Sequence, residues 1–431
     1  MVNLSQRITT AEVQKVRLGS EVVIAGWVEQ TKLLGKLAFL NIRDSEGYVQ
    51  VVATSSYLGM KELSGITRES VVSIRGKVKK SKAKSGGKEL ELIELDLLSK
   101  AAVPLPIEFL GKGIETDLSK RLDYRHIDLR NPKNLLVLKV LSTFVNASHA
   151  FFVNHGLIEI FSPKLIATPS EGGGEEFAIP YFKKKAYLAQ SPQFYKQMAN
   201  VAGLGGVFEI GPVFRANPSR TTRHDTEFTS LDVEISWLDD EGIRKFEERW
   251  LAYSLKAVKK RHGDEIKKVL GIDINIPKVP FPRIKMSEAL KIAGIKGDDL
   301  DPAGERKVFM NIKRRYNHQF VFVTDFPWSI RPFYHMKSGA NATKSFDLLF
   351  RGVEITTGAQ REHRYDILVK QAKEKGLNIK DLKFYLDFFK WGAPPHSGFG
   401  LSPTRVVMQM LELGNVREAT FVPRDTERLT P

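Results

Sequence analysis

The apolar pattern of the chain changes near residue 131, and this change divides the chain into two regions that must fold differently. Residues 20–102 contain short segments of β-branched or alternating apolar residues, with turns such as Ser45-Glu46-Gly47 between them. Segments of this kind are typical of β-strands. From Pro132 onward, long helical runs occur among the strands. The pattern predicts a small all-β domain followed by a larger mixed one.

The first region predicts a small closed barrel. Its strand segments read SEVVIAGWVEQ, LAFLNIRDSEGYVQVVA, ESVVSIRGKVKKS and KELELIELDLLSK. Size and strand number fit an OB-fold, which often holds oligonucleotides, although an SH3-like barrel would give a similar pattern. The proline-bearing segment AVPLPIEFLGKG then predicts a linker. We expect the barrel at residues 1–104, the linker at 105–131 and the second domain at 132–431.

The second region predicts an α+β domain built on an antiparallel sheet. Pro132 suits the first position of a helix, the run after it is apolar enough to be buried, and Gly156 supplies a stop. A charged helix is expected near residues 240–268, and a last helix from about Pro403 to Leu413. Because long excursions separate the strands, an antiparallel sheet is favoured over alternating βαβ units.

Composition limits the class of partner and the chemistry. The chain has 66 Lys+Arg against 50 Asp+Glu, a formal charge of +16 that suits a partner rich in phosphates. It has no cysteine, which excludes disulfides, thiolate metal sites and a thiol nucleophile. No apolar run approaches the roughly 18 residues that cross a bilayer, and the first residues lack a signal-peptide core. We expect a cytoplasmic protein with no membrane partner.

A cationic segment between two predicted strands is the first candidate for chemistry. The usual glycine-rich phosphate loops are missing, so side chains must hold any nucleotide. Residues 214–228 read FRANPSRTTRHDTEF and include Arg215, Arg223 and His224. Such a density of cations suits phosphate oxygens. A solvent-exposed basic turn would have the same composition.

The strand after this segment carries polar residues on one face. A two-residue period places Phe228, Ser230, Asp232 and Glu234 together, with apolar residues on the other face. An aromatic ring beside carboxylates is what a site for a stacked base and an ammonium group needs. The strand is therefore expected to form part of a binding site.

A second pair of carboxylates lies in the predicted hairpin SFDLLFRGVEIT. With Arg351-Gly352 as a two-residue turn, Asp347 and Glu354 fall on the same face of adjacent strands. Two facing carboxylates near a triphosphate are natural ligands for Mg²⁺. The alternative is that they cap a solvated face of the sheet.

Several segments resemble the signature motifs of class II aminoacyl-tRNA synthetases. GLIEIFSPKL with Pro163 resembles motif 1, FRANPSRTTRHDTEF resembles motif 2, and SGFGLSPTR resembles motif 3. PSEGGGEEF, QSPQFYKQ, EITTGAQREHRYDIL and WGAPPHSGFG look like the aspartyl and asparaginyl group of that class, and the overall length is similar to its short archaeal members. The resemblance implies a class II catalytic domain on an antiparallel sheet flanked by helices, an OB-fold that binds the anticodon, and a homodimer.

The resemblance further implies ATP-dependent attachment of L-aspartate to tRNA(Asp), and in some relatives also to tRNA(Asn), through an aspartyl-adenylate. Arg215 would hold the α-phosphate and stabilise the transition state. Phe228 and Arg405 would sandwich the adenine between a ring and a planar cation. The ATP-binding residues implied are Arg215, Arg223, His224, Phe228, Glu354 and Arg405, and the Mg²⁺ ligands implied are Asp347 and Glu354.

For the amino acid, the resemblance implies contacts from Glu171, Gln193, Lys196, Asp232 and Arg361. Lys196 and Arg361 would meet the side-chain carboxylate, and Gln193 and Asp232 the α-ammonium group, while Glu171 belongs to a loop that closes over the substrate. Two cations would select aspartate over asparagine, because asparagine brings no charge to offset theirs. Without the family context, Lys196 resembles an ordinary surface lysine on a helix.

In the barrel, Phe39 and Gln50 match positions that the family uses to stack on and read anticodon bases. Stacking on an aromatic ring is worth roughly 1–3 kcal/mol per base. The alternative for Phe39 is a place in the barrel core. The loop of residues 31–35 lacks the Arg-Asp that many relatives carry before their glycine.

Two motifs depart from the family pattern. Motif 2 usually has a glutamate where Asn217 stands, and motif 3 usually has glycine and glutamate within the segment Ser402-Pro403-Thr404. Ser402 suits an N-cap and Pro403 the first helical position, so the helix that presents Arg405 is still expected to start there. The departures bear on ATP affinity rather than on the fold.

Two other functions stay open. An asparaginyl-tRNA synthetase is disfavoured mainly by Lys196, since such enzymes usually lack this lysine. A divergent paralogue would bind tRNA or amino acid without charging, or would make asparagine from the adenylate. The joint presence of Arg215, Asp347 and Glu354 favours an active ligase, because a binding module needs neither an α-phosphate arginine nor a Mg²⁺ pair. The intact barrel argues against a tRNA-free asparagine synthetase, whose relatives lack it.

Overall fold

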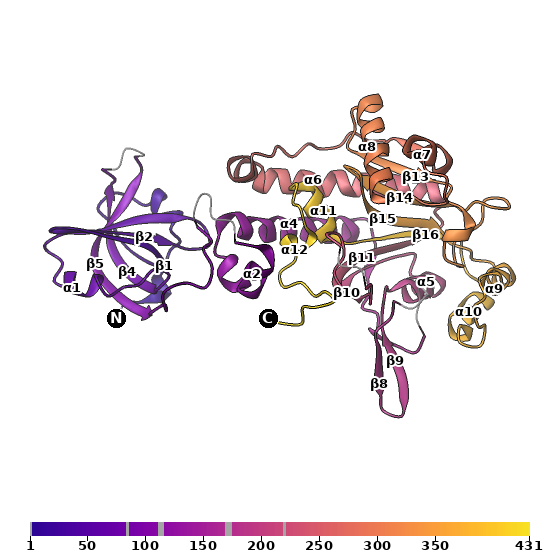
Figure 1. Ribbon diagram of the computed structural model, residues 1–431, viewed down its shortest axis with the longest axis horizontal. Coiled ribbons are helices and arrows are strands. Elements are labelled where there is room, and N and C mark those ends of the chain that lie inside the picture. The colour runs from indigo at the N-terminus through magenta and orange to yellow at the C-terminus, as the bar shows by residue number, and fades with distance from the viewer. Residues whose placement is uncertain (1, 83–85, 111–115, 169–174, 219–220) are drawn as a thin grey trace. The chain divides into compact units, whose positions relative to one another are not determined.

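The computed structural model describes residues 2–82, 86–110, 116–168, 175–218 and 221–431. The chain divides into two compact units, Met1–Leu135 and Leu136–Pro431, each of which is drawn in Figure 1. The predicted division differs in treating residues 105–131 as a separate linker, and those boundaries stay predictions.

The first unit contains the predicted closed barrel. Its strand order is β1-β2-β3-β5-β4, with β3 and β5 parallel and the other paired strands antiparallel. Alternate side chains point inward and form one apolar core that includes Leu40, Val51 and Ile74, which are fully buried. The strands are β1 (Glu21–Leu34), β2 (Leu37–Arg43), β3 (Tyr48–Ala53), β4 (Val71–Lys80) and β5 (Lys88–Ser99), and the short helices before and among them are η1 (Leu4–Gln6), η2 (Glu12–Lys15) and α1 (Met60–Leu63).

The segment after the barrel packs against it through a buried ion cluster. It contains the short helices α2 (Leu118–Asp123) and α3 (Arg125–Asp128). The fully buried carboxylate of Glu69 pairs with Arg43 at 2.7 Å and with Arg130 at 3.0 Å. Because removing one partner of a buried ion pair leaves an uncompensated charge, this cluster ties the segment firmly to the barrel.

The second unit is built on an eight-stranded sheet of order β12-β13-β14-β15-β16-β11-β10-β6. The five strand pairs from β13 to β10 are antiparallel, and the edge pairs β12–β13 and β10–β6 are parallel. The prediction of an antiparallel sheet is therefore confirmed. The strands are β6 (Ile158–Glu159), β10 (Gly206–Phe214), β11 (Glu227–Ser236), β12 (Arg283–Lys285), β13 (Phe320–Thr324), β14 (Ser345–Phe350), β15 (Val353–Gln360) and β16 (His396–Leu401).

Helices cover one face of this sheet and bury its main core (Figure 1). Leu231 and Val233 of β11 pack with Phe144 of the first covering helix and Trp250 of the second, and all four side chains are fully buried. The covering helices are α4 (Pro132–Asn154), α6 (Asp240–Leu270), α11 (Pro403–Met410) and α12 (Val416–Ala419).

Helix α4 corrects the expectation that no apolar run is long enough to cross a membrane. Its 23 residues include an 18-residue window with a mean hydropathy of 1.5, which is sufficient by length and composition. It alone has this property among the described residues. Its buried side chains, including Val140 and Phe152, belong to the main core, so its apolar character serves packing within the unit.

Two smaller cores hold the remaining helices. Val308 and Ile312 pack with Leu349 of β14 in a core formed by α7 (Met286–Ala293) and α8 (Pro302–Tyr316). Phe194 and Tyr385 stack at 4.2 Å in a core formed by α5 (Gln193–Val201), α9 (Tyr365–Glu374) and α10 (Lys383–Lys390). The other elements are β7 (Leu165–Ile166), β8 (Ala178–Tyr181), β9 (Lys184–Leu188) and η3 (Trp328–Ile330).

The helix predicted from Pro403 starts where expected but ends earlier, and the short helix α12 follows it. α11 ends at Met410 rather than at about Leu413. Ser402 takes the N-cap position and Pro403 the first helical position, as expected, but Ser402 makes no capping bond to the helix backbone. Its hydroxyl instead lies 2.7 Å from Thr404 Oγ1, so the threonine competes with the orphan backbone N–H groups that a cap normally satisfies.

Candidate active site

A polar cleft of about 250 Å³ lies on the face of the large sheet that points away from α4 and α6. Side chains of β11, β15 and β16 form its floor, and α5 and residues 331–335 form part of its wall. The predicted site residues that line it are Gln193, Lys196, Arg215, Phe228, Asp232, Glu354, Arg361 and Arg405. The structure therefore gathers eight residues from distant parts of the sequence.

Two buried cations and two buried carboxylates form one end of the cleft. Lys196 Nζ donates to Asp232 Oδ1 at 2.9 Å and lies 3.4 Å from Glu234 Oε2. Arg361 donates from Nε and Nη2 to the two oxygens of Glu234, at 2.9 and 3.3 Å. Lys196 is only 2% exposed, so its interpretation as a surface lysine is wrong. Burial alone would raise the pKa of Glu234, but Arg361 and Lys196 lower it below its ordinary value.

Two glycines of the motif 3 strand leave room for these carboxylates. Gly398 of β16 lies opposite Glu234, and Gly400 lies opposite Asp232. A Cβ atom on Gly398 would come within 2.1 Å of Glu234 Oε2, and one on Gly400 within 2.7 Å of Asp232 Oδ1. The pattern Gly-Phe-Gly therefore lets two carboxylates lie over a neighbouring strand.

A buried network holds Gln193 at the edge of the same end. Gln193 Nε2 donates to Gln197 Oε1 at 2.8 Å, and the Tyr385 hydroxyl donates to the same oxygen at 2.9 Å. Gln197 Nε2 in turn lies 2.9 Å from His396 Nε2. Because the amide nitrogen of Gln193 is engaged, its carbonyl oxygen is left to accept from a bound ammonium group.

The segment Arg331–His335 was not expected in the site, and it contributes three side chains to the cleft wall. Arg331, Tyr334 and His335 all line the cleft. His335 is 2% exposed, and Arg361 Nη1 donates to its Nε2 at 3.0 Å. No period or motif marks these residues in the sequence. Glu234, by contrast, is placed on the polar face of β11 by the two-residue alternation.

Aromatic and guanidinium groups gather at the other end of the cleft. Arg215 lies 5.5 Å from the ring centre of Phe228. Arg405 donates from Nη1 to the carbonyl oxygen of Glu354 at 3.0 Å and from Nη2 to that of Arg223 at 3.3 Å. Burial lowers the pKa of Arg405 from its ordinary value. Phe228 and Arg405 line the same cleft, which fits the predicted adenine sandwich.

A smaller hollow of about 60 Å³ adjoins this end, and its lining includes Arg223 and His224 of motif 2. Arg223 Nη1 pairs with Glu305 of α8 at 2.6 Å. Burial lowers the pKa of His224 to about 4, and nearby Arg405 lowers it further. His224 is therefore neutral near pH 7, so the positive charge here comes from arginine. Two departures from the family motifs, Asn217 and Thr404, also line this hollow.

The predicted carboxylate pair lies on one face of the β14–β15 hairpin. Arg351-Gly352 forms the expected turn, with φ values of 51° and 76°. A register shift between Leu348 and Leu349 adds a bulge that the sequence pattern did not predict. Asp347 is 8% exposed, so it does not cap a solvated face.

Asp347 already has a cation beside it. Arg331 Nη2 lies 2.7 Å from Asp347 Oδ2, while Asp347 Oδ1 is buried and accepts no hydrogen bond from any described residue. Burial raises the pKa of Asp347, and the charge of Glu354 raises it further. Among the described residues, no group of three or more metal-ligating side chains occurs.

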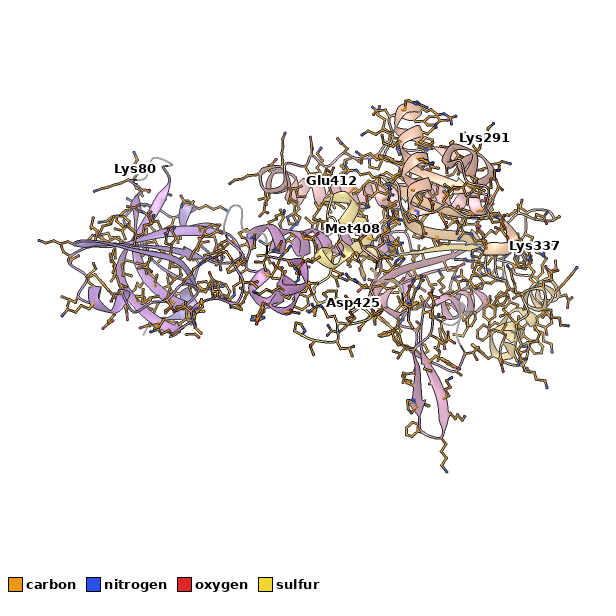
Figure 2. All side chains as sticks on the ribbon, in the orientation of Figure 1. Lys80, Lys291, Lys337, Met408, Glu412 and Asp425 are labelled. Carbon is orange, nitrogen blue, oxygen red and sulfur yellow. The ribbon has the colours of Figure 1, made fainter. Side chains whose placement is uncertain are left out.

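A separate hollow of about 450 Å³ lies on the outer surface of the barrel. Phe39 and Gln50 line it together with lysines that include Lys80, which Figure 2 labels near the end of β4. Phe39 is half-buried and lies outside the barrel core, so the alternative of a core position is wrong. Gln50 Nε2 donates to Glu89 Oε2 at 3.0 Å. The predicted loop residue Glu171 lies outside the described residues.

Comparison with known proteins gives matches over both units. Residues 117–426 match the class II tRNA synthetases (D, K and N), and residues 22–97 match the OB-fold nucleic acid binding domain. The chain is 42% identical to an aspartate–tRNA(Asp) ligase of Pyrococcus abyssi, covering 98% of this chain and 99% of that protein. It is 39% identical to an aspartate–tRNA(Asp/Asn) ligase of Aeropyrum pernix, with 96% of each covered.

A solved structure gives the same match in three dimensions. The asparaginyl-tRNA synthetase of Pyrococcus horikoshii, complexed with asparaginyl-adenylate, superposes with a TM-score of 0.89 at 32% identity. The superposition covers 98% of this chain and 99% of that one. Since aspartate and asparagine ligases share this fold, the amino acid must be inferred from the side chains of the cleft.

Proposed function

The chain belongs to the class II tRNA synthetases of the D, K and N group, and from this premise we propose that it attaches L-aspartate to tRNA(Asp). The reaction uses ATP and has two steps. The α-carboxylate of aspartate first attacks the α-phosphorus of ATP, forming aspartyl-adenylate and releasing pyrophosphate. A hydroxyl of the terminal adenosine of tRNA then attacks the acyl carbon and releases AMP.

The buried pair of Lys196 and Arg361 carries the assignment of the amino acid. Their two positive charges are matched by the carboxylates of Asp232 and Glu234. The ammonium group of a bound amino acid would take the place of Lys196 at Asp232. Lys196 would then be left for a side-chain carboxylate.

This exchange of partners distinguishes aspartate from asparagine. Aspartate brings one ammonium group to Asp232 and one side-chain carboxylate to Lys196, so the charges at this end stay balanced. Asparagine brings the ammonium group but no side-chain charge, and one buried cation then lacks a partner. An unpaired buried charge is costly, which favours aspartate.

For the first step, the arginines at the other end would bind and neutralise the triphosphate. Arg215 reaches the cleft next to Phe228, a place suited to an α-phosphate beside a stacked adenine. Its fixed charge would stabilise the negative charge that develops on the phosphate oxygens during attack. Arg405 and Phe228 would hold the base, with Arg223 close to the outer phosphates.

The residues present fit a Mg²⁺ ion at the hairpin carboxylates. Asp347 has one buried oxygen without a hydrogen bond, and Glu354 lines the cleft on the same face of the sheet. Oxygen ligands of this kind suit a hard divalent cation. Asp347 and Glu354 would hold the ion, whose charge would offset that of the phosphates. Arg331, which pairs with Asp347, would have to share or give up that carboxylate.

The barrel would bind the anticodon. Phe39 offers a half-buried ring in a hollow edged by Lys79, Lys80 and Lys82, a combination of stacking surface and phosphate-binding charge. Relatives are named for either tRNA(Asp) alone or tRNA(Asp/Asn). The hollow is compatible with recognition of tRNA(Asp) alone and with recognition of both tRNAs.

A homodimer is part of the proposal and is supported by exposed apolar residues of motif 1. Ile158 is 48% exposed, Phe161 82% and Leu165 49%, and a second copy of the chain would cover such exposed apolar side chains. Sedimentation of the purified protein tests it. We also place the enzyme in the cytoplasm, as expected for a ligase that supplies translation.

The choice of amino acid substrate is tested by ATP–pyrophosphate exchange with Mg²⁺, run with aspartate and with asparagine. Exchange with aspartate alone is the expected result. Exchange with asparagine alone would replace the proposal by an asparaginyl-tRNA synthetase. Absence of exchange with both, in a protein that still binds tRNA, would support the non-charging paralogue.

A further inference from the structure

His335 holds Arg361 from the side that Glu234 does not reach. Arg361 donates from Nε and Nη2 to Glu234 and from Nη1 to His335 Nε2, at 2.9, 3.3 and 3.0 Å. Both Arg361 and His335 are 2% exposed. Two supports on different sides fix the plane of the guanidinium group, which one carboxylate alone would leave free to tilt.

The contact defines the tautomer of the imidazole. A guanidinium group has only N–H donors, so His335 Nε2 must carry the lone pair and the ring proton must be on Nδ1. Burial lowers the pKa of His335 well below its ordinary value, and Arg361, Arg331 and Lys196 lower it further. The ring is therefore neutral. Its Nδ1 is buried and has no hydrogen-bond partner among the described residues, a cost that packing alone does not explain.

The arrangement leaves part of Arg361 available. Of the five N–H groups of a guanidinium, three are used by Glu234 and His335. The other two N–H groups have no protein acceptor among the described residues. The guanidinium group of Arg361 lines the cleft together with Lys196. Two fixed N–H groups match the two oxygens of a carboxylate.

We propose that His335 is a positioning residue for the amino acid: by accepting from Arg361 it directs the two remaining N–H groups at the side-chain carboxylate of aspartate. This inference rests on the proposed function. It adds a residue that contacts Arg361 rather than the substrate, and it explains why the supporting acceptor is an imidazole.

A neutral acceptor is needed at this position because the charges of the cleft are closely balanced. Lys196 and Arg361 already face Asp232 and Glu234. A carboxylate at position 335 would support Arg361 equally well, but it would cancel the charge that attracts aspartate. The imidazole provides the hydrogen bond without adding a negative charge.

The position allows this to be tested without disrupting the fold. The backbone of His335 pairs with that of Arg361, and the carbonyl oxygen of His335 accepts from Gln371 Nε2 at 3.0 Å. These bonds do not involve the imidazole. The informative variants are H335Q, a neutral acceptor of similar reach; H335L, which cannot accept; and H335E, a charged acceptor.

The measurement is aspartate-dependent ATP–pyrophosphate exchange on the full chain, with KM and kcat determined separately. H335L should raise the KM for aspartate about 10- to 100-fold, the effect of losing a hydrogen bond to a charged group, with kcat changed only a few-fold. H335Q should stay within a few-fold of the wild type. H335E should raise the KM at least as much as H335L. The matched control is H318L, since His318 is also buried but lies outside the cleft.

Equal KM values for H335L and H335Q, or an unchanged KM in H335L, would overturn the inference. A second readout does not depend on activity. The ¹⁵N shifts of the His335 ring, assigned from their loss in H335Q, should report a neutral ring protonated on Nδ1 from pH 6 to 8. A ring protonated on Nε2 would overturn the inference even if the wild type failed to activate aspartate, and that failure would itself refute only the proposed function.

Discussion

At the scale of single residues, the cleft depends on charges that are buried together. Lys196 is held by two carboxylates. A neutral side chain in its place would leave these negative charges uncompensated at the point where the side-chain carboxylate of aspartate has to bind. Truncating one partner of a buried, hydrogen-bonded charge pair costs roughly 2–5 kcal/mol. The effect on function is therefore expected to be large.

We predict that K196M lowers kcat/KM for aspartate in exchange by roughly 10²- to 10³-fold. Methionine keeps most of the length of the side chain and removes its charge. Far-ultraviolet circular dichroism should remain close to that of the wild type. The control is K245A, because Lys245 is 60% exposed on α6. Normal exchange by K196M would refute the assignment of Lys196.

A second residue of interest is Glu247, which is fully buried on α6. Burial raises its pKa from 4.5 to about 8. Between these two values the unfolded chain has already lost the proton that the folded chain keeps, so this group makes the free energy of unfolding fall as pH rises.

E247Q should remove this dependence. Relative to the variant, the wild type should lose at most about 4 kcal/mol of unfolding free energy between pH 5 and pH 8, and the loss should level off about one pH unit higher, once the folded-state carboxyl group has also ionised. Urea unfolding at a series of pH values measures it, with E265Q on the exposed side of α6 as the control. Parallel pH profiles for the wild type and E247Q would contradict the prediction.

The sequence was a good guide to residues that repeat with the period of a strand or belong to a recognisable motif. The two-residue alternation placed Asp232 and Glu234 on one face, and the motifs led to Lys196 and Arg361. Arg331 and His335 were missed, because a segment between regular elements has no period and its contacts form only when the chain folds. Lys196 appeared exposed in isolation, because its carboxylate partners are 36 and 38 residues away in the sequence.

At the scale of elements, the site depends on how β11, β15 and β16 lie side by side. The sequence predicted the β14–β15 hairpin and its turn correctly. The bulge between Leu348 and Leu349 was not predicted, since an extra residue in one strand leaves the alternation almost unchanged. The end of α11 was also placed too late, because apolar residues continue past the helix into the core.

The glycines of β16 allow a prediction about this arrangement. In G398A the new Cβ would meet the backbone oxygen of Val233 at 2.2 Å; because the strands must separate, the unit should be clearly destabilised. In G400A the nearest atom is the side-chain oxygen of Asp232 at 2.7 Å, which can move. G400A should therefore keep its melting temperature within a few degrees but raise the KM for aspartate at least tenfold.

Thermal unfolding and exchange kinetics on the same preparations would separate the two effects. G414A is the control, because a Cβ there meets only Glu418 Oε1, at 4.0 Å. If G398A were as stable as G414A, or if G400A bound aspartate normally, the proposed role of these glycines would be wrong.

At the scale of the whole molecule, the two units would divide the work between the anticodon and the chemistry. Because Phe39 lies on the outer surface of the barrel and Leu40 in its core, neighbouring substitutions should behave differently. F39A should raise the KM for tRNA about 10- to 100-fold and leave aspartate-dependent exchange unchanged.

L40A is the contrasting variant, since it should destabilise the barrel itself by creating a cavity. Charging assays across tRNA concentrations, with exchange measured in parallel, distinguish the two variants. A loss of exchange in F39A would mean that the ring supports the fold rather than the RNA.

If this chain is an aspartate–tRNA ligase, it must charge purified tRNA(Asp) transcript with labelled aspartate. We predict ATP- and Mg²⁺-dependent formation of aspartyl-tRNA by the wild type and severe loss in K196M. Asparagine should not be attached, and a tRNA(Asn) transcript in the same assay establishes the tRNA range. Transfer of asparagine in place of aspartate, or no transfer by a folded protein that binds tRNA, would show that the chain is not an aspartate–tRNA ligase.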